Sequence, residues 1–251
     1  MSLRFASLGS GSRGNATLVE FDDTLLMIDC GLPRRTTEER IRALGRSASD
    51  ITAVLISHEH SDHINGIGPF QRRYRKPIWL TPGTGTVLGS VLERRNLNCH
   101  GTLKIGAIEV EPFPVPHDAR EPCQFVFRAG KRQLGVMTDT GHITSHIRER
   151  LAACDALAVE ANHDSEALRR SDYPDSLKHR VGSDFGHLNN DQTAGLLEQL
   201  KHPRLQWVVG LHLSERCNTP EHVRAKLEPV LGETALHLAQ QDEATGWMVV
   251  E

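Results

Sequence analysis

The most informative stretch of this chain is Ser57-His58-Glu59-His60-Ser61-Asp62-His63. It holds three imidazoles and the Asp62 carboxylate, and it directly follows an apolar run, residues 53–56, that predicts a buried strand. Such a strand carries side chains from a rigid element into a loop, where they can converge. Neutral imidazole and carboxylate are ligands that suit zinc, manganese and iron. We therefore interpret the stretch as part of a metal site rather than as an accidental, solvated cluster of histidines.

Further His and Asp residues lie at or just past the carboxyl ends of other predicted strands. They are Asp29 after residues 25–28, His117 after 113–115, Asp139 after 135–137 and His212 after 208–211. Strand ends that gather on one edge of a sheet are where α/β folds build their sites. Packing does not explain five ends of this kind, so the sequence predicts one site assembled from all of them.

Length and charge bound the class of protein. The chain has 251 residues without a repeat, low-complexity segment or linker, so we expect residues 1–251 to form a single domain with a sizeable core. Its formal net charge of −3 excludes a protein whose whole surface is positively charged and attracts nucleic acid. A local basic face remains compatible with this net charge. The basic run of residues 72–76 includes one aromatic residue. It is either a surface along which a nucleic acid binds or a solvated helix face.

The cysteines and the N-terminus indicate the compartment. The five cysteines are scattered and form no CxxC pair, which is typical of a reduced, intracellular protein. The first residues have no apolar signal segment, and no stretch approaches the roughly 20 apolar residues that a membrane helix needs. We therefore expect a cytoplasmic protein with no membrane partner.

Short strands alternate with helices along the chain, which predicts a mixed α/β fold. A helix is expected over residues 36–44, with Thr36 and Glu39 forming a capping box, and another over residues 220–227. The polar segment 164–186 predicts a long loop, which is either functional or a solvated excursion.

The order of these motifs resembles the metallo-β-lactamase superfamily. The resemblance implies an αββα sandwich of two mixed β-sheets with a binuclear metal site along one edge. By this resemblance one ion is held by His58, His60 and His117, the other by Asp62, His63 and His212, and both by Asp139. Asp29 is implied to steady these ligands. The implied cofactors are two divalent ions, Zn²⁺ or Mn²⁺, with iron as an alternative. Two metal ions about 3.5–4 Å apart can bind a phosphoryl group between them.

A closer resemblance is to the YycJ/WalJ-type exonuclease-like branch of that superfamily. It is carried by LGSGSRGNAT (8–17), VPHDA (115–119), TDTGH (138–142), EANHD (160–164), YPDSLKHR (173–180), GHLNN (186–190), HLS (212–214) and NTP (218–220). The resemblance implies a metal-dependent 5′-to-3′ exonuclease that acts on the 5′ ends of single-stranded DNA or RNA. Asn189 replaces the more usual Ser, a change of little cost because both residues can cap the helix expected near Asp191.

The candidate catalytic residues are Asp62 and His187. His187 precedes a predicted helix, and related phosphodiesterases place a His here near the scissile phosphate; the alternative is a surface His in a capping loop. Lys178 and Arg180 are candidate phosphate-binding residues, or else they lie on a solvated face. Asn15, in the Gly-rich loop, either lines the site or belongs to a tight hairpin turn.

Other functions stay open at this point. A small-molecule cyclic phosphodiesterase would use the same metal site with a tighter pocket. A glyoxalase-type thioesterase normally carries a helical C-terminal region, whereas strands are predicted near the end of this chain. A non-catalytic, regulatory metalloprotein is a third alternative, and a homodimer is compatible with the sequence.

Overall fold

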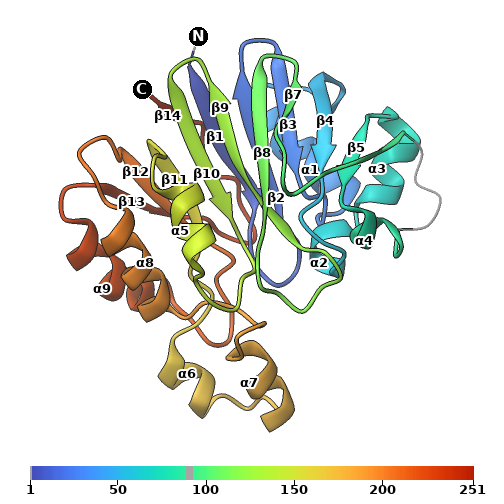
Figure 1. The fold of residues 1–251 in the computed structure, drawn as a ribbon. Coiled ribbons are helices and arrows are strands. Elements are labelled where there is room, and N and C mark those ends of the chain that lie inside the picture. The colour runs from blue at the N-terminus through green and yellow to red at the C-terminus, as the bar shows by residue number, and fades with distance from the viewer. Residues whose placement is uncertain (1, 89–92) are drawn as a thin grey trace.

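A computed structural model describes residues 2–88 and 93–251, which form two mixed β-sheets packed face to face (Figure 1). The first sheet has the order β14 (Met248–Val250), β1 (Leu3–Gly9), β2 (Ala16–Phe21), β3 (Thr24–Ile28), β4 (Ile51–Leu55), β5 (Ile78–Leu80), β6 (Arg94–Asn96). The second has the order β13 (Ala235–Leu238), β12 (Trp207–Leu211), β11 (Ala156–Glu160), β10 (Arg132–Met137), β9 (Cys123–Ala129), β8 (Ile108–Pro114), β7 (Leu103–Ile105).

Helices cover the outer faces of both sheets (Figure 1). The helices of the described residues are α1 (Arg34–Ala43), the 3₁₀ turn η1 (Ala48–Asp50), α2 (Ser61–Ile64), α3 (Ile67–Tyr74), α4 (Pro82–Gly85), α5 (Ser145–Leu151), α6 (Ser165–Arg170), α7 (Asp175–Val181), α8 (Asn190–Leu200) and α9 (Pro220–Leu231). None of them is long and apolar enough to cross a membrane.

Three apolar cores hold the layers together. Phe5 of the first sheet and Phe125 of the second meet in the core between the sheets. A second core joins the first sheet to α1 and α3, where Phe70 is fully buried. A third joins the second sheet to α5, α8 and α9, through residues such as Leu197 and Val223. Burial of these apolar faces stabilises four layers, and the predicted αββα sandwich is confirmed.

The strand ends meet at one edge of the sandwich. β3 and β4 are parallel neighbours in the first sheet, and β10, β11 and β12 are parallel neighbours in the second. Both sets end at the lower edge in Figure 1, where α2, α6 and α7 lie. Because parallel strands end together, the residues that follow them are brought to a common place.

Two local predictions were wrong. Helix α1 begins at Arg34, with Pro33 at its N-cap and no side-chain cap, so the expected capping box of Thr36 and Glu39 does not form. The helix starts two residues earlier than expected, and the Pro33 carbonyl accepts its first helical hydrogen bond, from the Thr37 amide at 3.0 Å. The segment 164–186 is not a loop but contains α6 and α7. Its helical periodicity is weak because α7 buries none of its residues.

Two predictions near the C-terminus are confirmed. Asn189 caps α8, because its side chain accepts a hydrogen bond from the Gln192 main-chain amide at 2.8 Å, and Oε1 of Gln192 accepts one from the Asn189 main-chain amide at 2.9 Å. Helix α9 begins at Pro220, as the sequence predicts. In the described part of the chain, the residues after α9 form β13 and β14, one in each sheet, instead of a helical C-terminal region.

Candidate active site

The structure brings together the seven residues that the sequence predicts as metal ligands. Their potential ligand atoms fall into overlapping groups in which all atoms lie within 4.8 Å of one another. The groups are His58, His60 and His117; His58, His63 and Asp139; Asp62, His63 and His212; and Asp139 and His212 together with Glu160 and His187. The two predicted trios therefore exist as geometric clusters, and Asp139 lies between them.

The imidazoles of His60 and His117 lie edge to face, with ring centres 4.9 Å apart. Nε2 of His60 donates to the main-chain carbonyl of Asp118 at 3.2 Å, and Nδ1 of His117 donates to that of Gly186 at 2.9 Å. The other two nitrogens, Nδ1 of His60 and Nε2 of His117, lie 3.1 Å apart with no proton left to share. Two lone pairs that converge in this way are arranged as ligands for a cation.

Asp29 orients two further imidazoles from behind. It accepts a hydrogen bond from Nδ1 of His63 at 2.7 Å and one from the Ser57 hydroxyl at 2.9 Å. Because that hydroxyl donates to Asp29, it accepts from Nδ1 of His58, which lies 2.9 Å away. Each ring is left with Nε2 facing the cluster. Burial lowers the pKa of His58 well below its ordinary value, which keeps that ring neutral and able to bind a metal.

His212 and Asp62 complete the second trio. Nε2 of His212 lies 3.2 Å from Oδ2 of Asp62 and 3.3 Å from Oδ1 of Asp139. The amide of Asn162 contacts His212 from the other side, 3.0 Å from Nδ1, and donates to its main-chain carbonyl at 2.9 Å. Asn15 donates to Asp62 at 3.2 Å. The Gly-rich loop thus steadies a predicted ligand, and Asn15 is buried behind it.

Three residues at these strand ends have left-handed backbone angles. φ is 59° at Asp29, 30° at Asp139 and 56° at His212. Such angles are uncommon outside glycine and cluster at functional sites, where the surrounding fold must hold them. Here they direct the side chains that follow β3, β10 and β12 away from the strand pattern and toward the shared edge. Sequence patterns carry no signal for this strain.

The chemistry of this cluster fits divalent metal ions. In the described structure, Nε2 of His58 and both carboxylate oxygens of Asp139 are buried and make no hydrogen bond. Oδ2 of Asp139 nevertheless lies 2.6 Å from Nε2 of His63. A buried carboxylate without hydrogen bonds is costly unless a cation balances it. The predicted ligand residues therefore suit a pair of ions that Asp139 would bridge.

His187 lies beside this cluster, held by a carboxylate that sequence analysis did not identify. Nδ1 of His187 lies 2.7 Å from Oε1 of Glu160 and 3.2 Å from Oδ1 of Asp139. The other Glu160 oxygen accepts from the amides of Thr140 and Leu188, both at 3.1 Å. Glu160 is the last residue of β11, so the rule that located the other strand-end residues could have found it.

Burial would lower the pKa of His187, but Glu160 and Asp139 outweigh it and raise this pKa to about 10. Asp139 would share its charge with bound metal ions, so Glu160 is the partner that favours the protonated ring. Because Nδ1 faces Glu160, the nitrogen available to a substrate is Nε2.

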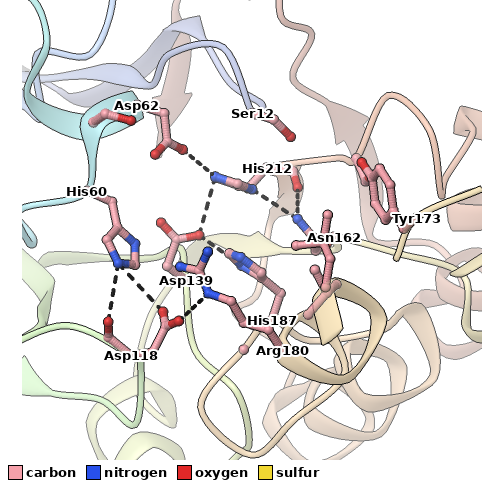
Figure 2. A pocket seen from close by; sticks show the side chains of 15 residues that line it. Ser12, His60, Asp62, Asp118, Asp139, Asn162, Tyr173, Arg180, His187 and His212 are labelled. Carbon is pink, nitrogen blue, oxygen red and sulfur yellow. Dashed lines mark hydrogen bonds and ion pairs between the residues drawn. The ribbon is translucent and has the colours of Figure 1, made fainter. Parts of the chain in front are cut away.

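A cavity of about 400 Å³ opens beside the cluster (Figure 2). It is lined by Ser12, His60, Ser61, Asp62, Asp118, Asp139, Asn162, Tyr173, Leu177, Arg180, Val181, Gly186, His187, His212 and Ser214. Arg180 and His187, two of the candidate substrate-binding residues, thus border the cavity. Lys178 does not: it lines a groove on the other side of α7, and its ammonium donates to the Arg169 carbonyl at 3.1 Å.

The basic run of residues 72–76 lies at the end of α3. Its aromatic ring, Tyr74, packs 4.8 Å from the ring of Phe70, and its hydroxyl donates to Glu38 at 2.7 Å. Because the tyrosine ring is packed against the protein in this way, it is not free to stack on bases, and the run forms a helix face rather than a nucleic-acid-binding surface.

Known proteins are similar to this chain in sequence. A family model described as the beta-lactamase superfamily domain matches residues 24–210. The chain is 33% identical over 249 residues to the exodeoxyribonuclease YycJ of Bacillus anthracis, across 97% of this chain and 94% of that protein. It is 31% identical over 229 residues to the exodeoxyribonuclease WalJ of Streptococcus pneumoniae, across 88% of this chain and 85% of that protein.

A solved structure agrees on the fold. The metallo-beta-lactamase fold protein YhfI from Bacillus subtilis matches with a TM-score of 0.77 at 15% identity, and the match covers 98% of this chain and 99% of that one. The chain therefore belongs to the beta-lactamase superfamily, in its YycJ and WalJ branch, and is a metal-dependent hydrolase.

Proposed function

We propose that this protein is a binuclear metal-dependent phosphodiesterase that acts as a 5′-to-3′ exonuclease on DNA or RNA, with residues 1–251 as a single metallo-hydrolase domain. The observation that carries the proposal is the position of His187. Its ring lies 3.2 Å from Asp139, between the predicted ligands and the cavity, and Glu160 holds it in place. A phosphate that bound the ligand cluster would therefore meet a proton donor.

The ligand chemistry suits Zn²⁺ or Mn²⁺, with Fe as an alternative. Two such ions, when bound by His58, His60, Asp62, His63, His117, Asp139 and His212, would supply Lewis-acid activation of a phosphate group and of water. Residues of the protein itself carry out the proton transfers. His187 holds a proton at Nε2 and donates it to the leaving oxygen. Asp62 borders the cavity and is oriented by Asn15, so its carboxylate can accept a proton from the attacking water.

The names of the relatives support nucleic acid as the substrate, since both YycJ and WalJ are exodeoxyribonucleases. Arg180 adds a cationic group at the cavity, which suits a phosphate backbone. Because nucleic acid lies inside the cell, we also propose that the protein acts in the cytoplasm.

The test uses purified protein whose metal content has been measured. With Mn²⁺ or Zn²⁺, 5′-phosphorylated single-stranded DNA or RNA labelled at its 3′ end should shorten stepwise from the 5′ end. A cyclic nucleotide and a thioester are assayed in parallel. A protein that opened the cyclic phosphodiester quickly and ignored the strands would overturn the exonuclease proposal. A small-molecule cyclic phosphodiesterase is the second candidate function, because the cavity of about 400 Å³ is also large enough for one cyclic nucleotide.

A further inference from the structure

Helix α7 and the residues on either side of it form one wall of the cavity, in a segment whose two short helices were not predicted from the sequence. We call residues 165–187, which comprise α6, α7 and the loop after them, the α6–α7 arm; it projects beyond the edge of the sheets (Figure 1). Its loop is tied to the site, since the Phe185 carbonyl accepts from the Asp118 amide at 2.9 Å and the Asp184 carbonyl accepts from Nδ1 of His142 at 2.8 Å. A Cβ on Gly141 would lie 2.2 Å from Asp184, so only glycine permits this close docking. The arm is therefore placed firmly against the ligand cluster.

Arg180 has guanidinium N–H groups that can donate hydrogen bonds to a ligand in this cavity. Its Nε donates to the carboxylate of Asp118, whose other oxygen lies 3.6 Å from Nε2 of His60 (Figure 2). Among the described residues, no hydrogen-bond acceptor or ion-pair partner engages its two Nη groups. Asp118 thus fixes the guanidinium at one nitrogen and leaves the others for a second anion. A guanidinium held in this way can bind a terminal phosphate with two parallel hydrogen bonds.

Tyr173 adds an aromatic surface to the same cavity (Figure 2). The guanidinium of Arg216 lies 5.6 Å from the centre of its ring, and Arg216 is in turn paired with Asp172 at 3.6 Å. The tyrosine is therefore partly ordered without being buried, as a platform for stacking should be. Base stacking on aromatic side chains is tolerant of sequence because every base has a π-face.

We infer that Arg180 and Tyr173 form a subsite for the 5′-terminal nucleotide, with its 5′-phosphate on the Nη groups of Arg180 and its base on the ring of Tyr173. The inference rests on the proposed exonuclease function and specifies which end the enzyme reads. The volume of about 400 Å³ lies at the lower end of the roughly 300–1,000 Å³ range of ligand pockets, and a single nucleotide is a ligand of that size. One nucleotide is therefore released in each cycle.

The chemistry of the cut is consistent with this subsite. The oxygen of water forms a bond to phosphorus, and the bond from phosphorus to the 3′ oxygen of the terminal nucleotide breaks. The water loses its proton to Asp62, and the leaving 3′ oxygen gains one from His187. The released nucleotide keeps its 5′-phosphate, and the shortened strand carries a new 5′-phosphate. Each cut thus recreates the group that Arg180 binds.

The experiment compares three strands that differ only at the 5′ end: one with a 5′-phosphate, one with a 5′-hydroxyl, and one with a 5′-phosphate on an abasic first nucleotide. The variants are Arg180→Gln, Tyr173→Leu and the ring-retaining Tyr173→Phe. Arg170→Gln is the matched control, because Arg170 on α6 is paired with Glu166 alone among the residues that the structure describes, and it does not line the cavity. Metal content and thermal unfolding are measured for every variant.

Wild-type enzyme and Arg170→Gln should prefer the 5′-phosphorylated strand over the 5′-hydroxyl strand. Arg180→Gln should lower kcat/KM on the phosphorylated strand by roughly 10–100-fold, the range for losing a charged hydrogen-bond partner, and bring the ratio of the two strands close to one. Tyr173→Leu should lower kcat/KM by roughly 5–100-fold on the strand with a terminal base, and Tyr173→Phe should not. On the abasic strand Tyr173→Leu should match wild type.

An Arg180→Gln enzyme that kept the wild-type ratio would overturn the phosphate assignment, and a Tyr173→Leu enzyme equally impaired on the abasic strand would overturn the stacking assignment. A wild-type enzyme that did not distinguish the three strands would overturn the subsite without use of any variant. Failure of the function itself is recognised separately. In that case wild-type enzyme loaded with metal would cleave neither the strands nor bis(4-nitrophenyl) phosphate.

Discussion

Nδ1 of His63 donates a hydrogen bond to Oδ2 of Asp29 at 2.7 Å, across 34 positions of sequence. Both residues are almost fully buried, with side chains 0% and 4% exposed. This bond decides which nitrogen of His63 faces the ligand cluster, and it brings the end of β3 against α2. Asp29 therefore acts on the predicted metal site through the orientation of a ligand.

Asp29→Asn should weaken metal binding while the fold is retained. Asparagine has nearly the same volume, but its neutral oxygen is a weaker acceptor for Nδ1 of His63 and for the Ser57 hydroxyl. Loss of such a partner behind a ligand typically costs 10–100-fold in metal affinity, so we expect a loss of about that size. Titration of Zn²⁺ or Mn²⁺ against a competing chelator measures it. Wild-type affinity in the variant would show that Asp29 has no part in the site.

Asp139→Ala should impair both predicted ion positions. It removes the carboxylate whose oxygens lie 2.6 Å from Nε2 of His63 and 3.3 Å from Nε2 of His212. Metal analysis of wild-type protein should find up to about two divalent ions per chain, and the variant should hold clearly fewer than one. Asp23→Ala, in the turn between β2 and β3, is the control and should match wild type. A variant that retained both ions would contradict the bridging role.

His187→Ala should separate catalysis from metal binding. The variant should keep its metals, because His187 lies outside the two predicted trios, and its thermal stability should fall because the buried Glu160 loses its imidazole partner. Its turnover on oligonucleotides should fall by roughly 10²–10⁴-fold, the range for loss of a general acid. His58→Ala, in contrast, should lose metal as well as activity. Wild-type turnover in His187→Ala would leave this residue as a His in a capping loop.

Gly31→Ala should disturb the site through the backbone. A Cβ at this position would lie 1.6 Å from the Asp62 carbonyl oxygen and 2.8 Å from the Asn15 amide nitrogen. Helix α2, with Asp62 and His63, must then move, at a cost of about 1–3 kcal/mol or more in unfolding free energy. Thermal unfolding and metal content should both fall. Gly195→Ala is the matched control: nothing lies within 4 Å of its Cβ, so alanine should stabilise α8 by about 0.5–1 kcal/mol.

His163 should make the metal-free protein sensitive to acid. Burial lowers the pKa of this side chain from its ordinary value of 6.5 to about 4. Between those two pH values the unfolded chain binds a proton that the folded chain does not, so stability falls as pH decreases, by up to about 3 kcal/mol. Urea unfolding at several pH values should show a steeper loss in wild type than in His163→Gln. Parallel curves for the two proteins would refute this account.

Much of the site was predictable because it obeys a local rule. Apolar runs such as residues 53–56 and 208–211 indicate strands, and polar residues at their ends mark the edge where a site forms. The same rule also applies to Glu160, because it is the last residue of β11. The α6–α7 arm was not predictable in this way. Its helices are short and polar, and what holds it to the site is backbone contact with residues 118 and 142.

The apolar runs and the polar residues at their ends thus predict a mixed α/β fold, a set of candidate ligands and the edge where they meet. The αββα sandwich and the division of the ligands between two ions were implied by the resemblance to the superfamily. Two features are apparent only in three dimensions: which nitrogen of each imidazole faces inward, and that Arg180 borders the cavity while Lys178 lies across α7 from it. These features depend on partners far away in sequence, such as Asp29 for His63 and Asp118 for Arg180, which meet only when the strands that precede them assemble into a sheet.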